Sequence, residues 1–240
     1  MKNKNFEEIK KLFTWNQTLV STVLVILNLI MFLWMQITYG TTTEAVPLVE
    51  AGANFAPMII QGGEWYRLIT AAFIHIGAAH LLMNLVVLFF LGIELEPIMG
   101  SWRFIILYFV SAIGGNLMSF AFSNSISAGS STALFGMFAA MLVLSYVYPD
   151  NRYLRQRSMS MGFVLLLNVI LGMINQGVDN FGHIGGALFG ALITLILQTP
   201  LKSDIKISHK VIAGAAIIVL AFFFVYYGFT SRGAGLGGIF

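Results

Sequence analysis

The chain has 240 residues, of which 58% are hydrophobic and only 10% are charged, and its mean hydropathy is +0.85. Soluble domains carry about 25% charged residues, so this composition excludes a water-soluble globular protein and indicates a protein of the bilayer. The absence of cysteine excludes disulfides, thiolate metal sites and cysteine nucleophiles. The net charge is only +3 and the basic residues are not clustered among aromatics, so the sequence does not indicate a nucleic-acid-binding surface.

Seven apolar stretches are candidates for membrane-spanning helices, which need roughly 17–25 residues. In chain order they are Leu19–Ile37, Phe73–Leu95, Phe104–Phe122, Ser131–Tyr148, Met159–Ile174, Phe181–Leu197 and Val211–Phe229. The first is longer than the apolar core of a signal peptide and lacks a small-x-small cleavage site, so we expect it to be a span. The sequence therefore predicts an all-α membrane protein, a polytopic bundle of seven transmembrane helices.

The connections between the spans suggest a division of the chain into three parts. We expect a short cytoplasmic segment at residues 1–16, a six-span core at 17–198, and a cytoplasmic loop, seventh span and outer tail at 199–240. Apolar residues of Met1–Phe13 fall on one side of a helix, as in a short amphipathic helix on the inner face. The loop after the first span is rich in apolar and aromatic residues, which predicts a structured element packed in the outer interface.

Basic residues orient the predicted bundle. Eleven of the thirteen lie before the first span or between spans two and three, four and five, and six and seven; the exceptions are Arg67 and Arg232. Because basic residues concentrate on the cytoplasmic side, we expect a cytoplasmic N-terminus and an extracytoplasmic C-terminus. The compact chain, with no transit sequence, indicates a bacterial plasma membrane.

Polar residues gather where the second, fourth and sixth spans begin. Such groups are costly inside a membrane and are functional candidates by default. Even-numbered spans run from outside to inside, so their starts share one layer in the outer part of the bilayer. The residues concerned are His75, His80 and Asn84, then Gly129, Ser130 and Ser131, and finally Asp179 and His183.

These residue types suit acyl transfer. A serine hydroxyl becomes a nucleophile when an adjacent imidazole takes its proton, a role that Ser131 and His183 can share. An attacked amide develops an oxyanion that needs fixed donors. His80 and Asn84 are four residues apart, hence on one helix face, and the backbone N–H of Ser131 at a helix start is a third donor.

Small residues predict how the serine and the histidine meet. Helix axes ordinarily lie ~8–10 Å apart, and small residues allow a closer approach. We therefore expect the fourth and sixth spans to touch along two stripes. These stripes are Gly136, Ala139 and Ala140 in the fourth span, and Gly182, Gly186 and Gly190 in the sixth.

The same blocks, in this order, resemble the rhomboid family, whose pattern is His-x4-His-x3-Asn, then Gly-x-Ser, then a histidine followed by glycines. The matching positions are His75, His80, Asn84, Gly129, Ser131, His183, Gly185 and Gly186. The segments 64–67 and 92–96 also look like rhomboid signatures, so the resemblance covers roughly residues 60–195.

The resemblance implies a rhomboid-like fold and an intramembrane serine endopeptidase, with a Ser131–His183 dyad and an oxyanion hole of His80, Asn84 and the Ser131 amide. It implies transmembrane segments of other proteins as substrates, cut near the outer face within the lipid bilayer. No cofactor, metal or nucleic acid is expected. A seventh span after a six-span core is similar to one subgroup of the family.

Several alternatives stay open. The chain could be a catalytically silent rhomboid-like protein that binds transmembrane clients, or a transporter, although a transporter needs ionisable groups along a path. Ser130 competes with Ser131 as the nucleophile, and the downstream segment 133–136 favours Ser131 when matched to the family. Thr132 stands where many members have glycine; we expect activity to survive this difference, whereas its effect on the cleavage rate is not predicted. His75 is either structural or functional.

The remaining charged candidates are assigned structural roles. Asp179 is a possible third member of a triad, but we expect it to cap the sixth span. Glu94 and Glu96 near the inner end of the second span are not expected to take part in chemistry. For Arg103 and Arg67 we predict pairing with nearby acceptors.

Overall fold

The computed structural model describes residues 18–174, 177–200 and 205–236, and within them every regular element is a helix. The first loop contains short helices, and longer helices follow. The elements are α2 (Leu19–Tyr39), α3 (Ala45–Glu50), α4 (Ala56–Gly62), α5 (Arg67–Thr70), the 3-10 helix η2 (Ala71–Phe73), α6 (Gly77–Met99), α7 (Ser101–Phe122), α8 (Ser131–Val147), α9 (Arg152–Ile174), α10 (Asn180–Leu197) and α11 (Ile207–Leu236). The amphipathic helix predicted for residues 1–13 lies outside the described residues.

The predicted all-α membrane fold is confirmed, and each predicted span coincides with one long helix. Within the described ranges, α2, α6, α7, α10 and most of α11 are long and apolar enough to cross a bilayer. Helix α8 is apolar but has 17 residues, and α9 opens with a polar segment. The count of seven spans therefore stays a prediction.

The start of α6 differs from the expected start of the second span. We predicted Phe73, but the chain leaves η2 there, runs extended through Ile74, and enters α6 only at Gly77, whose φ of +78° suits glycine. His75 consequently precedes the helix, and His80 lies in its first turn. Apolar periodicity did not separate the approach segment from the helix proper, because both consist mainly of apolar residues.

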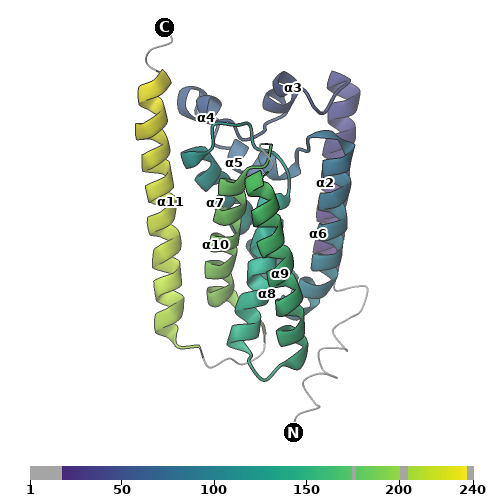
Figure 1. Ribbon diagram of the computed structural model, residues 1–240, viewed down its shortest axis with the longest axis vertical. Helices are drawn as coiled ribbons and strands as arrows, with labels where there is room; N and C mark the ends of the chain where they lie inside the picture. Colours follow the sequence, from purple (N-terminus) through teal and green to yellow (C-terminus); the bar gives the residue numbers. More distant parts are fainter. Residues whose placement is uncertain (1–17, 175–176, 201–204, 237–240) are drawn as a thin grey trace.

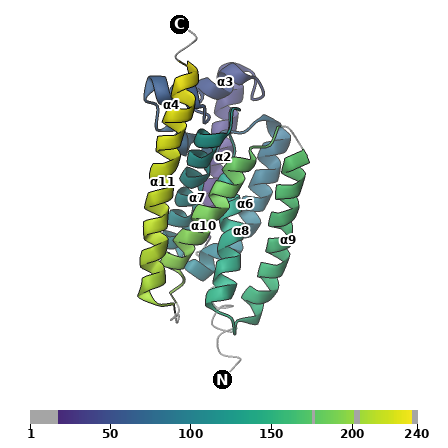
Figure 2. The ribbon, with the colours of Figure 1, turned by 60° about the vertical axis from the view of Figure 1, so that its left-hand side comes forward.

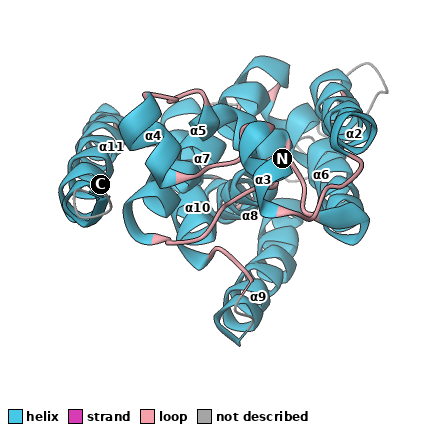
Figure 3. Cartoon of the chain, turned by 90° about the horizontal axis from the view of Figure 1, so that it is seen from above, coloured by secondary structure: helices cyan, strands magenta, loops and turns pink. Residues whose placement is uncertain are grey.

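The long helices form one bundle around α7, α8 and α10 (Figure 1). Helix α10 packs on both α7 and α8, and α11 covers α7 and α10 on one side. On the other side α2 packs on α6, and α9 stands out from the bundle against α8 (Figures 2 and 3). The short helices of the first loop gather at the end of the bundle where α6, α8 and α10 begin (Figure 1).

Glycines let α8 and α10 touch through their backbones. A Cβ on Gly186 would collide with the backbone of Thr132, and one on Gly190 with the backbone of Gly136. The contact predicted between the small-residue stripes of the fourth and sixth spans is thus confirmed. This contact places the first turn of α8 beside the first turn of α10.

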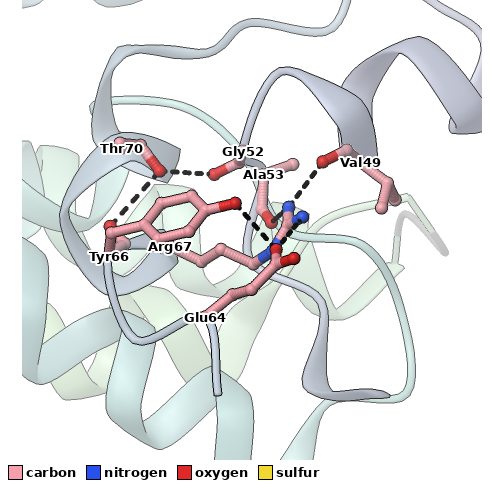
Figure 4. A network of polar contacts seen from close by, with 7 residues as sticks. All are labelled: Val49, Gly52, Ala53, Glu64, Tyr66, Arg67 and Thr70. Carbon is pink, nitrogen blue, oxygen red and sulfur yellow. Dashed lines mark hydrogen bonds and ion pairs between the residues drawn. The ribbon is translucent and has the colours of Figure 1, made fainter. Parts of the chain in front are cut away.

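The first loop is folded, as predicted, and Arg67 organises it (Figure 4). The buried guanidinium donates to the carbonyl oxygens of Val49 at 2.5 Å and Ala53 at 2.9 Å, and it forms an ion pair with Glu64. The Tyr66 hydroxyl and then Arg67 donate hydrogen bonds that lower the pKa of Glu64, so this carboxylate stays ionised opposite the guanidinium. The predicted pairing of Arg67 is confirmed.

This loop also braces the segment that leads into α8. Asn54 and Ser127 exchange two backbone hydrogen bonds of 2.9 Å, and the Gly129 amide donates to the Ala71 carbonyl at 2.9 Å. The Asn54 side chain in turn donates to the Asn116 carbonyl of α7 at 2.9 Å. Irregular backbone at this depth is therefore paired with protein groups, as a membrane environment demands.

The charged residues near the far end of α6 have structural partners. Glu94 forms an ion pair with Arg157 of α9, and Arg103 donates to the Met99 carbonyl at 3.2 Å. Glu96 is fully buried and accepts from the backbone amides of Val20 at 3.0 Å and Ser21 at 2.8 Å. A carboxylate thus binds the positive N-terminal end of α2.

We predict that Glu96→Gln lowers the free energy of unfolding by about 1–3 kcal/mol. The substitution removes the negative charge, and the side-chain NH₂ of glutamine would face a backbone N–H of α2 that now donates to a carboxylate oxygen. Thermal unfolding followed by circular dichroism in detergent measures the loss. Glu50→Gln on the exposed surface of α3 is the control and should be neutral. Equal melting temperatures for both variants would contradict the capping role of Glu96.

Candidate active site

Ser131 and His183 meet where α8 and α10 begin. Ser131 is the first residue of α8, His183 lies in the first turn of α10, and its Nε2 is 2.9 Å from the serine Oγ. The residues are 52 positions apart in the chain, so the contact depends on the close approach of the two helices. This distance suits proton transfer from the hydroxyl to the imidazole.

The histidine ring is held by packing on its face. Phe135 stacks on it with 4.0 Å between the ring centroids and 10° between the planes. Phe135 follows Ser131 by four residues, so both lie on one face of α8. Sequence reasoning missed this residue, although its spacing from the serine was available as a signal.

Asp179 caps α10, as predicted. Its Oδ1 accepts from the backbone amide of Gly182 at 3.0 Å. The Nδ1 of His183 has no hydrogen-bond partner in the part of the chain that the structure describes. The arrangement is therefore a serine–histidine pair with no carboxylate bonded to the ring.

Two further polar residues of α6 face the same space. The Nδ2 of Asn84 is buried and, among the described residues, has no hydrogen-bond partner. Gly129 makes room for this amide and for His80, since a Cβ at Gly129 would lie 3.3 Å from Asn84 Nδ2 and 2.7 Å from His80 Cε1. Its φ of +128° also requires glycine. Gly129 is thus needed for both space and backbone shape.

A cavity of about 520 Å³ joins these groups. His80 and Asn84 line it from α6, Ser131 and Thr132 from α8, and His183 from α10. Residues of α9 and of the loops before α8 and α10 complete the wall. The structure therefore brings the two predicted catalytic residues and the predicted oxyanion donors to one cavity.

Ser130 and His75 lie behind this site. The Ser130 amide donates to Nε2 of the fully buried His75 at 3.4 Å, and the Ser130 hydroxyl is buried with no hydrogen-bond partner, His183 included, among the described residues. The His75 ring lies 5.3 Å from that of His80. His75 thus supports the turn that presents Ser131. The choice of Ser131 over Ser130 as nucleophile agrees with this geometry and stays a prediction.

Comparison with known proteins points to one family. Residues 62–200 match the family model described as the Rhomboid domain. The chain is 34% identical to the Rhomboid protease GluP of Bacillus subtilis, over 94% of this chain and 42% of that protein. It is 34% identical to RHOMBOID-like protein 1 of Arabidopsis thaliana over 64% of this chain and 40% of that protein. For the Rhomboid protease AarA of Providencia stuartii the identity is 28%, over 88% and 82%. The chain thus spans about two-fifths of the length of the first two relatives.

We predict that Gly190→Val separates α8 from α10 and destabilises the protein by about 1–3 kcal/mol or more, because the added atoms overlap the Gly136 backbone. The matched control is Gly214→Val on α11, where a Cβ has nothing nearer than 3.8 Å. Thermal unfolding and the labelling rate of the serine by a fluorophosphonate probe report on the two effects. An unchanged labelling rate in Gly190→Val would show that the serine–histidine contact does not depend on this helix approach.

Proposed function

This chain belongs to the rhomboid family, and from that premise we propose that it is an intramembrane serine endopeptidase with Ser131 as nucleophile and His183 as general base. The observation that carries the proposal is the 2.9 Å contact between the serine Oγ and the histidine Nε2, on the wall of a 520 Å³ cavity. Such a contact activates a hydroxyl that is otherwise a weak nucleophile.

In the proposed reaction the Ser131 oxygen attacks a substrate carbonyl carbon while its proton passes to Nε2 of His183. The tetrahedral intermediate collapses as the C–N bond breaks, and His183 gives the proton to the leaving amine. Water then attacks the acyl-enzyme and loses a proton to the same nitrogen. The ester C–O bond breaks as His183 returns that proton to the Ser131 oxygen, which releases the new carboxyl end and restores the enzyme. Stacking on Phe135 holds the ring in one plane through these steps.

The oxyanion needs donors that are already in position. We assign this role to the Asn84 amide, His80 and the backbone N–H of Ser131. The buried Nδ2 of Asn84, which has no hydrogen-bond partner among the described residues, supports the assignment, because a donor left without a partner in a membrane protein is costly unless a ligand uses it. Removal of one such donor typically lowers a rate by about 10²–10³.

We further propose transmembrane segments of other membrane proteins as substrates, cut near the outer face. The supporting observation is the position of the site at the ends of α8 and α10 that lie beside the folded first loop. The proposed setting is a bacterial plasma membrane, with residues 1–16 in the cytoplasm, a six-span core at 17–198, and the seventh span and outer tail in 199–240.

The test incubates the purified chain in detergent with a tagged single-span substrate and compares Ser131→Ala, Ser130→Ala and His183→Ala. We expect cleavage by the wild type and by Ser130→Ala, with loss of about 10³-fold or more in the other two. Cleavage by Ser131→Ala would overturn the assigned nucleophile. A folded wild type that binds but never cuts several substrates would point to the catalytically silent alternative.

Asp179→Asn should retain most of the activity, since an asparagine oxygen also caps a helix and the native carboxylate makes no hydrogen bond to His183. Steady-state cleavage rates at several pH values measure this, with circular dichroism to confirm folding. A thousandfold loss of rate in the folded variant would make Asp179 a member of a triad instead.

A further inference from the structure

Asn168 is a polar side chain within the apolar stretch of α9. The surrounding segment 163–170 is otherwise apolar, and the Asn168 side chain is exposed. Together with Val164, one turn earlier, it lines the cavity that contains Ser131 and His183. An exposed amide inside a predicted span is costly and calls for a physical reason.

The amide is only partly satisfied by its own helix. Its Nδ2 donates one hydrogen bond to the Val164 carbonyl at 2.8 Å. That bond uses one of two N–H groups and leaves the oxygen, which accepts hydrogen bonds, unassigned. Asn168 therefore presents a donor and an acceptor together, which is the pair of groups that a peptide backbone also presents.

Several of the other polar groups of the cavity already have hydrogen-bond partners, whereas the buried Thr132 hydroxyl and Asn84 amide have none among the described residues. Ser131 and His183 bond to each other, Asp179 caps α10, and the backbone of Ser127 pairs with that of Asn54. These groups come from α8, α10 and their loops, whereas α9 stands apart from the central bundle (Figure 3). Asn168 is the polar side chain that α9 contributes to the lining.

A transmembrane substrate creates a specific need in such a cavity. Its peptide bonds are protected by helical hydrogen bonds, and cleavage requires that a turn be opened. Each freed N–H or C=O is costly where water is scarce, unless a protein group takes over its hydrogen bond. The wall toward α9 is otherwise apolar in its described lining, through Val164.

We infer that Asn168 binds the backbone of the unwound substrate segment, with its side-chain amide replacing a hydrogen bond lost from the substrate helix. This inference rests on the proposed function for its substrate class. It makes Asn168 a substrate-binding residue on the part of the cavity wall that α9 contributes. The ligand group is a peptide amide, so the contact is independent of the substrate's side chains.

The experiment measures binding separately from cleavage. The 240-residue chain carrying Ser131→Ala is titrated in detergent with a fluorescent single-span peptide, with Asn168 intact or changed to Leu or Gln. We expect Asn168→Leu to weaken binding about five- to tenfold, as loss of a hydrogen bond does, and Asn168→Gln to bind within about twofold of the parent because it keeps the amide. Ser160→Leu, an exposed polar-to-apolar change on the same helix outside the cavity lining, is the matched control and should bind normally.

A second series locates the contact. Peptides in which successive backbone amides near the cut are replaced by esters lose one N–H donor each. At one position, the ester should weaken binding to the protein with Asn168 but not to Asn168→Leu, because the two changes then remove one interaction. Equal affinities of the Asn168 and Asn168→Leu proteins, or ester penalties that are the same in both at every position, would overturn the inference. A wild type that never cleaves would overturn the proposed function alone, since the binding results still decide the role of Asn168.

Discussion

The backbone contact between α8 and α10 is the constraint on which the site depends. The Ser131 Oγ and the His183 Nε2 can lie 2.9 Å apart only if the helices that carry them come close. Any side chain larger than hydrogen at Gly186 or Gly190 would hold these helices apart. In water such a contact would gain little, because glycine buries little apolar area. In a bilayer, where lipid chains are as apolar as leucine, close packing of backbones is itself a source of association. The medium and the glycines together therefore fix the geometry of the pair.

A second constraint concerns backbone that is not helical. The turn from Ser127 to Ser130 presents the first residue of α8, and its polar groups need partners inside the protein. The first loop supplies them through Asn54 and Ala71. That loop is itself held by Arg67, whose guanidinium donates to the carbonyl groups of Val49 and Ala53. The turn before α8 is thus linked to a buried arginine outside the site, because Arg67 holds Ala53 and the next residue, Asn54, pairs with Ser127.

The sequence predicted those features that follow from composition and periodicity. Long apolar runs located the helices, and polar residues at the starts of three spans identified Ser131, His183, His80 and Asn84, which the structure brings to one cavity. It could not predict the start of α6 at Gly77, because the approach to that helix is as apolar as the helix itself. It also missed the stacking of Phe135 on His183 and the bonds of Glu96 to α2. Those contacts join segments distant in the chain, so the spacing of Phe135 from Ser131 places both on one helix face but does not by itself identify the partner ring.

Helix α9 shows how position decides the role of a polar residue in one span. Near its start, Arg157 forms an ion pair with the nearly buried Glu94 of α6, so the charge on each side is compensated. Eleven residues later, about 16 Å along the helix, Asn168 lies beside the cavity with an amide that its own helix only partly uses. Removing either partner would leave the other charge uncompensated, which is costly for the nearly buried Glu94. An amide left half-satisfied on a cavity wall has the opposite property, since its remaining hydrogen bonds are available to a ligand. The two parts of α9 therefore differ in role: Arg157 pairs the helix with its neighbour, and Asn168 has hydrogen-bonding capacity that the described residues do not use.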